Sequence, residues 1–257
     1  MFKAIRISVL LLVLFFITVS TYLTQARSTD WNNSLYVKVY PINADGSAAS
    51  ARYIERLTVD TFAGIEDFVS REVQRYGRTL DRPVRIRLGQ EIGEQPPALE
   101  ADRGRLDIMW WSLRMRWWAN SVAGPQDPPD PDVRIFVRYH APSETFVLEN
   151  SVGLQKGMVG IVNAYAGRRH RGTNNVIIAH EFLHTLGATD KYDPADGTPT
   201  YPDGYAEPDL QPRHPQKRAE IMGGRIAVSE FDARVPKSLK YAVIGTMTAR
   251  EIRLLRE

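Results

Sequence analysis

The eleven residues from His180 to Asp190, HEFLHTLGATD, constrain this 257-residue chain more than any other stretch. On a helix, residues four apart lie one turn apart on the same face, so His180 and His184 can present both imidazole rings to one metal ion. Glu181 is rotated by about 100° from His180, so it lies beside the metal, where its carboxylate can accept a proton from water. The stretch therefore predicts a zinc site.

Two histidines leave such a site incomplete, because catalytic zinc usually has three protein ligands. Gly187 can adopt the left-handed conformation that ends a helix and turns the chain back. That turn brings Asp190 within reach of the metal. Other histidine and acidic side chains that follow compete for the third position: Asp193, Glu207 and His214.

The pattern His-Glu-x-x-His-x-x-Gly-x-x-Asp resembles the consensus of the metzincin zinc peptidases, in the snapalysin-like variant where aspartate replaces a third histidine. The resemblance implies zinc bound by His180, His184 and Asp190, with Glu181 as the general base. On its spacing, Asp190 is preferred to the other candidates. The family also has a methionine turn beneath the metal, and Met222 is the candidate because two glycines follow it.

The same resemblance implies an α/β (α+β) zincin-like fold, in which a mixed twisted sheet carries an active-site helix and a carboxy-terminal helix covers the site from below. The residues Val152–Val162 occupy the place of an antiparallel edge strand that binds the substrate peptide. Several metzincins have a tyrosine two residues after the methionine, to stabilise the tetrahedral intermediate, whereas this chain has Gly224. Three tyrosines of the preceding loop are candidates for that role: Tyr192, Tyr201 and Tyr205.

The activity expected from the resemblance is that of a zinc-dependent endopeptidase acting on proteins or peptides. Two alternatives stay open: a non-catalytic zinc-containing envelope or interaction module, and a zinc amidase acting on cell-wall peptides. The presence of Glu181 favours an enzyme, because a purely structural metal site has no use for a general base.

The amino-terminal segment predicts export or membrane attachment. Lys3 and Arg6 precede an uncharged stretch, residues 7–26, which Arg27 closes. The stretch has the basic start and apolar core of a signal peptide, yet it is also about long enough to cross a bilayer. For residues 1–27 we favour an uncleaved anchor, with the basic end in the cytoplasm and the remaining chain outside. The protein is thus expected to be membrane-anchored or secreted.

Composition agrees with one folded domain over residues 28–257, and the resemblance to metzincins implies its division into an upper half to about residue 187 and a lower half at 188–257. The chain is 43% hydrophobic and 25% charged, which suffices for a substantial core. Its net charge of +3 comes from dispersed basic residues, so nucleic-acid binding is not indicated. Cysteine is absent, which excludes a disulfide framework.

Hydrophobic periodicity predicts the remaining elements. We expect strands at residues 35–40, 84–88, 133–137 and 151–166. A helix is expected from Ser50 to Tyr76, followed further on by an exposed loop at 124–131. The active-site helix is expected to be capped by Thr173 or Asn174, and a terminal helix to begin with a capping box at Thr248.

Four of the five tryptophans lie between residues 110 and 118. Trp110, Leu113 and Trp117 can share one helical face. A sugar-binding platform and a membrane-surface belt are both conceivable for such a face. We expect it to pack into the core, because large aromatic side chains dominate core energetics.

Overall fold

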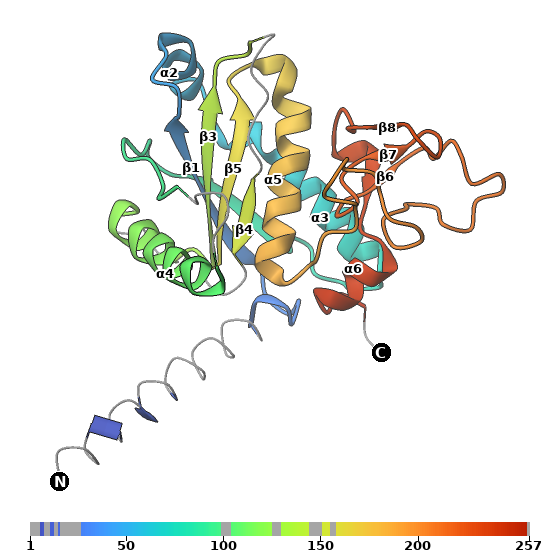
Figure 1. The fold of residues 1–257 in the computed structure, drawn as a ribbon, viewed down its shortest axis with the longest axis horizontal. Coiled ribbons are helices and arrows are strands. Elements are labelled where there is room, and N and C mark those ends of the chain that lie inside the picture. Colours follow the sequence, from blue (N-terminus) through green and yellow to red (C-terminus); the bar gives the residue numbers. More distant parts are fainter. Residues whose placement is uncertain are drawn as a thin grey trace.

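A five-stranded mixed sheet forms the centre of the protein, in a computed structural model that describes residues 6–7, 11–12, 15, 27–98, 104–124, 130–143, 151–154 and 158–255. The strand order is β2-β1-β3-β5-β4 (Figure 1). Every neighbouring pair is parallel except β4 with β5. The strands are β1 (Leu35–Asn43), β2 (Val84–Leu88), β3 (Val133–His140), β4 (Val152–Leu154) and β5 (Val159–Tyr165). The α/β class and the mixed sheet are therefore confirmed.

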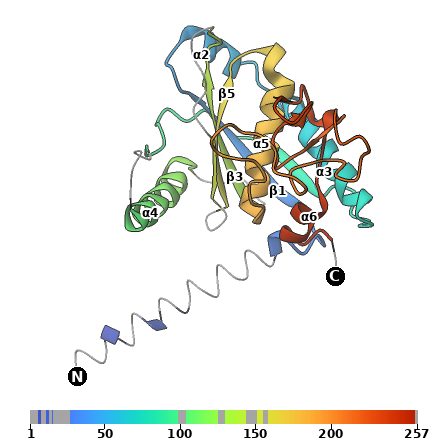
Figure 2. The same cartoon turned by 45° about the vertical axis from the view of Figure 1, so that its right-hand side comes forward.

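Helices cover both faces of the sheet. Figure 2 shows α4 on one face and α3 and α5 on the other. The helices are α2 (Ala48–Ile54), α3 (Ala63–Arg75), α4 (Arg105–Val122), α5 (Arg171–Leu186) and α6 (Thr246–Glu251). A hydrophobic core lies on each face of the sheet, and the side chains of β1 point alternately into the two. Val37 and Val39 pack towards α3 and α5, whereas Tyr40 and Ile42 pack towards α4.

The lower half of the chain lies beside α5, on the side away from α4 (Figures 1 and 2). It consists mainly of loops, with two-stranded pairs that join β6 (Ala219–Glu220) to β9 (Ala242–Val243) and β7 (Ile226–Ala227) to β8 (Ala233–Arg234). Short 3-10 turns complete the described chain: η1 (Val59–Thr61), η3 (Arg168–His170) and η4 (Leu239–Tyr241). One hydrophobic core contains residues from both halves, from Trp31 to Leu254.

The predicted helix from Ser50 to Tyr76 is wrong as a single element. It is divided into α2, η1 and α3. Thr58 interrupts it with an extended backbone, and the Thr61 hydroxyl accepts a hydrogen bond from the Thr58 amide at 3.3 Å. Threonine side chains compete in this way with the helical hydrogen bonds. The cap of α2 is Ser47, whose hydroxyl accepts from the Ser50 amide at 3.0 Å.

The single strand predicted at 151–166 is two strands, β4 and β5. Strand β5 lies inside the sheet between β3 and β4, so the antiparallel edge is only Val152–Leu154 instead of Val152–Val162. The strand predicted at 84–88 is confirmed, and those that begin at residues 35 and 133 extend to Asn43 and His140.

The expected packing face of α4 is wrong. Trp110, Leu113 and Trp117 are exposed, and the opposite stripe packs on Tyr40 and Phe136. That buried stripe contains Trp111, Met115, Trp118 and Ala119. The helix carries large apolar side chains on two sides, so its periodicity alone does not select the side that faces the sheet.

The terminal helix α6 begins at Thr246 after Gly245, two residues before the predicted capping box. Thr248 lies inside the helix, and its hydroxyl donates to Glu220 at 2.8 Å. A buried acceptor from another segment thus replaces the local cap that the sequence indicated.

No helix in the described ranges is long and apolar enough to cross a membrane. Most of the predicted membrane segment, residues 7–26, lies outside those ranges, and so do residues 125–129 of the predicted loop.

Candidate metal centre

Helix α5 is fixed to the sheet near its beginning. It starts at Arg171, before the predicted caps Thr173 and Asn174. The Asn174 side chain instead pairs with the backbone of Tyr165 in β5: its amide donates to the Tyr165 carbonyl at 2.9 Å, and its oxygen accepts from the Tyr165 amide at 3.3 Å. This double contact sets the position of α5 along β5.

The predicted turn at the end of α5 is confirmed. Gly187 is left-handed, with φ 108°. Its amide donates to the His184 carbonyl at 3.0 Å, and the Ala188 amide donates to the Leu183 carbonyl at 3.1 Å. Such a pair of hydrogen bonds satisfies the last carbonyls of a helix and reverses the chain. The reversal brings Asp190 back to the two histidines.

Three potential ligand atoms form a triangle with equal sides. The Asp190 Oδ1 atom lies 3.1 Å from Nε2 of His180 and 3.1 Å from Nε2 of His184. The two Nε2 atoms are also 3.1 Å apart. Tetrahedral ligands at zinc-bond lengths of about 2.0–2.1 Å are separated by roughly 3.3 Å. The sides of the triangle are therefore close to the spacing of ligands around a tetrahedral metal ion.

The hydrogen bonds of the rings direct both Nε2 atoms to this triangle. The Nδ1 atom of His180 donates to the Ile221 carbonyl at 2.9 Å, and that of His184 donates to the Ala188 carbonyl at 2.8 Å. Because a carbonyl oxygen only accepts, each Nδ1 carries the hydrogen. In the neutral rings, two Nε2 lone pairs then face each other and the carboxylate of Asp190. A cation between them removes this repulsion.

The pKa values of His180 and Asp190 also indicate that positive charge is favoured between these side chains. Burial disfavours the imidazolium form of His180, but the hydrogen bond with Asp190 and the charge of Glu181 outweigh burial, so the pKa of His180 lies above its ordinary value. Burial alone raises the pKa of Asp190, yet the hydrogen bonds that its carboxylate accepts from the rings in their protonated form hold that pKa well below the usual range.

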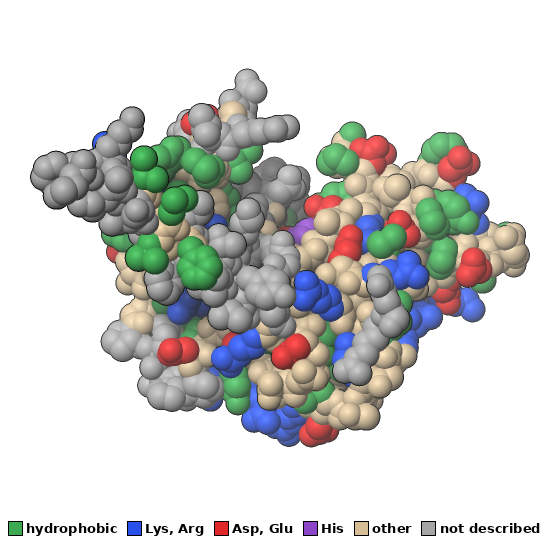
Figure 3. All heavy atoms as spheres, turned by 90° about the horizontal axis from the view of Figure 1, so that it is seen from below, with side chains coloured by type: hydrophobic (Ala, Val, Ile, Leu, Met, Phe, Trp, Pro, Cys, Tyr) green, Lys and Arg blue, Asp and Glu red, His purple; other side chains and the backbone are tan. Residues whose placement is uncertain are grey.

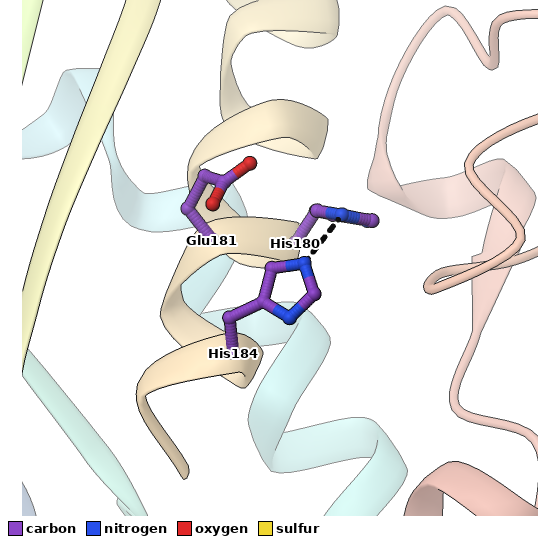
Figure 4. Close-up of side chains that lie close together, drawn as sticks. All are labelled: His180, Glu181 and His184. Atoms are coloured by element: carbon purple, nitrogen blue, oxygen red, sulfur yellow. Dashed lines mark hydrogen bonds between the residues drawn. The ribbon is translucent and has the colours of Figure 1, made fainter. Parts of the chain in front are cut away.

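The carboxyl group of Glu181 is buried beside the two histidines, and one of its oxygens, Oε2, has no hydrogen-bond partner. Figure 4 shows its carboxyl group to one side of the two rings, and possible ligand atoms of His180, Glu181 and His184 lie within 4.8 Å of one another. Burial raises the pKa of this carboxyl, and the nearby histidines offset only part of that effect. Asp190, with its shorter distances to both rings, fits the third ligand position better.

Glu220, to which sequence reasoning assigned no role, holds the turn around Met222. Its buried carboxylate accepts hydrogen bonds from the amides of Met222 at 2.7 Å, Gly223 at 2.8 Å and Gly245 at 2.9 Å. The same turn presents the Ile221 carbonyl to His180. Met222 itself is fully buried in the core. Only the fold identifies this role, because no local pattern marks a glutamate in a short strand as buried.

The loop that carries Asp190 is attached to α6 and to the Met222 turn. The buried Lys191 ammonium group donates to Glu251 at 2.7 Å and to the Thr189 carbonyl at 2.9 Å. Glu251 also accepts from the Thr189 amide at 3.0 Å. The Lys191 amide donates to the Met222 carbonyl at 3.0 Å. Both neighbours of Asp190 are thus fixed.

A cavity of about 600 Å³ opens beside His180 and Glu181. Of the three candidate tyrosines, Tyr192 lines this cavity, whereas Tyr201 and Tyr205 pack on each other with ring centroids 5.5 Å apart. The competing third ligands make other contacts: His214 with Tyr205, Glu207 with Arg218 and Asp193 with the Ala195 amide.

Strand β4 lies directly against α5. A Cβ atom added to Gly153 would be 2.4 Å from His184 Cβ and 2.7 Å from the Glu181 carbonyl oxygen. Only glycine permits so close an approach. The edge strand is therefore next to the candidate metal centre.

We expect Gly153→Ala to lower the free energy of unfolding by about 1–3 kcal/mol, because the added methyl group overlaps a backbone carbonyl that cannot move without displacing α5. Chemical denaturation followed by circular dichroism measures this loss. Gly93→Ala is the control, because a Cβ there meets nothing within 4 Å. Equal stability of both variants would contradict the close contact.

No protein-family model matches the chain, and no curated protein matches it either. The residues of the candidate centre and their geometry are thus the basis for assigning a function.

Proposed function

We propose that the chain is a zinc-dependent endopeptidase of the metzincin type, with His180, His184 and Asp190 as ligands and Glu181 as general base. The observation that carries the proposal is the triangle of ligand atoms 3.1 Å apart, with a buried and unpartnered carboxylate oxygen beside it. Zinc bound there would polarise the scissile carbonyl and make water a stronger nucleophile.

The chain's own residues supply the proton transfers. The Glu181 carboxylate accepts a proton from the attacking water and passes it to the nitrogen of the leaving amine. A carboxyl group with a raised pKa retains that proton more readily than an exposed one. Tyr192, on the cavity wall, is the tyrosine best placed to donate a hydrogen bond to the tetrahedral oxyanion.

Two features of the fold support the proposal that the peptidase is of the metzincin type. The antiparallel edge strand β4 lies against α5, so an extended peptide can pair with it beside the candidate metal centre. The buried Met222 turn provides a hydrogen-bond acceptor to His180.

We also propose that residues 7–26 anchor the protein to a membrane or direct its export, which places the peptidase outside the cytoplasm.

The proposal is tested by zinc content and peptide cleavage of the full chain and of Asp190→Ala. We expect one zinc per wild-type chain, and we expect the variant to bind zinc more than about 100-fold more weakly and to lose cleavage, because removal of a ligand costs more than removal of an outer hydrogen-bond partner. Asp203→Ala is the matched control, an exposed aspartate in the following loop.

Three other outcomes would contradict the proposal. Zinc retained without cleavage in the wild type would indicate the non-catalytic module. Cleavage of cell-wall peptides alone, in a mixed-substrate assay, would indicate an amidase. A wild-type chain without zinc would exclude the metal centre.

A further inference from the structure

The outward side of α4 has a continuous apolar stripe. At 100° per residue, Met109, Trp110, Leu113 and Trp117 fall within about 100° of arc. Trp117 is 75% exposed and Trp110 62% exposed, and Met109 and Leu113 are close to half exposed. We name these four residues the outer stripe. Figure 3, seen from below, shows exposed hydrophobic side chains on the left, the side on which α4 lies in Figure 1.

Core packing does not account for the outer stripe, because the opposite side of α4 already fills the core. Trp111, Met115 and Trp118 are buried there, with Trp118 against Phe136 at a ring-centroid distance of 4.7 Å. Two exposed tryptophans on one helix are costly in water, and an exposed apolar stripe of this kind marks a binding surface.

The charges beside the outer stripe are basic. On the same helical projection, Arg114 and Arg116 lie on either side of it. Asp107 is the one acidic residue of α4, and its carboxylate accepts the Gly104 amide at 3.1 Å at the start of the helix. Tryptophan with flanking arginine is the composition of helices that lie at a lipid–water interface. A basic flank also favours anionic lipid head groups.

The outer stripe lies at the end of the domain where the amino-terminal segment enters. Arg27, which directly follows the apolar stretch 7–26, pairs with Asp132 at 3.5 Å. Asp132 immediately precedes β3, the next strand after α4 in the chain. Figures 1 and 2 both show α4 and the beginning of β1 in the lower part of the molecule. On the proposal that residues 7–26 anchor the chain, the bilayer lies at the lower end of the sheet in Figure 1, which is also the end where α4 lies.

We propose that the outer stripe of α4 binds the surface of a bilayer that contains anionic lipids, with its tryptophans at the boundary between head groups and acyl chains. The interaction does not depend on the peptidase activity. It holds the domain against the membrane in one orientation, in addition to the attachment through residues 7–26.

The test uses the full chain in vesicles of phosphatidylcholine and phosphatidylserine with brominated acyl chains, which quench nearby tryptophans. We compare wild type with Leu113→Asp, which keeps all five tryptophans and alters a partly exposed position. We expect quenching in the wild type and at least about a tenfold smaller quenched fraction in the variant, because a charge in the stripe opposes insertion. Phe231→Asp, at a 90% exposed position in the lower half, should quench like wild type.

Acrylamide, a quencher in the aqueous phase, separates the other outcomes. Equal acrylamide quenching with and without vesicles, and no effect of the brominated lipids, would overturn the proposal. Protection that grows with the ratio of protein to lipid would assign the stripe to a second copy of the chain instead. Unchanged circular dichroism of Leu113→Asp, which we expect for a surface substitution, shows that its loss of quenching is not unfolding.

Discussion

Replacement of Glu181 by glutamine is expected to lower kcat for peptide hydrolysis by about 10²–10⁴-fold and to leave the zinc content unchanged. The amide has the same shape as the carboxyl group but cannot take a proton from water. Because Glu181 Oε2 has no hydrogen-bond partner, the substitution breaks no structural contact at that atom. Elemental analysis and steady-state kinetics on the same preparations measure both effects.

The control for this variant is Glu230→Gln, at an exposed position in the lower half. Full activity of Glu181→Gln would exclude Glu181 as the general base. Loss of zinc together with activity would have a different meaning, because it would make Glu181, and not Asp190, the third ligand. The compact group of His180, Glu181 and His184 makes this outcome a real alternative to test.

The second large effect is expected for Glu220→Ala, which removes a carboxylate from the core. The amides of Met222, Gly223 and Gly245 and the hydroxyl of Thr248 lose their acceptor. Each buried donor left without a partner costs about 1–3 kcal/mol, so we expect the free energy of unfolding to fall by at least about 4 kcal/mol. That is a large part of the 5–15 kcal/mol typical of a folded protein.

Urea denaturation of the metal-free protein measures this loss, and zinc titration measures its effect on the centre. Zinc affinity should also fall, because the Ile221 carbonyl that orients His180 belongs to the same turn. Glu230→Ala is the control, because its side chain is exposed. A decrease below about 1 kcal/mol would show that water or a rearranged backbone replaces the lost acceptor.

The sequence was sufficient to predict those features that depend on residues close together in the chain. The spacing of His180 and His184 places both rings on one face of α5, and Gly187 predicts the turn that returns Asp190. Backbone geometry within a few residues determines each of these features. The same holds for β2, whose alternation matches its bounds.

The sequence was insufficient where the partner comes from a distant segment. The two apolar sides of α4 are equivalent in the sequence, and the sheet selects the side with Met115. Thr248 has the pattern of a local cap, but Glu220 offers it a buried acceptor. The role of Glu220 is itself hidden, because its donors lie on two turns that are more than twenty residues apart in the chain.

The contacts of Lys191 and Thr189 with Glu251 have a consequence for the order of assembly. His184 is held by α5 and its turn, whereas His180 also depends on the Ile221 carbonyl, and the position of Asp190 depends on α6, some sixty residues further along the chain. A nascent chain that has not yet emerged as far as α6 has the imidazoles but no anchored carboxylate. If the proposed zinc centre forms, we therefore expect tight metal binding only in molecules in which both halves have come together, because a partly synthesised chain lacks the contacts that hold Asp190.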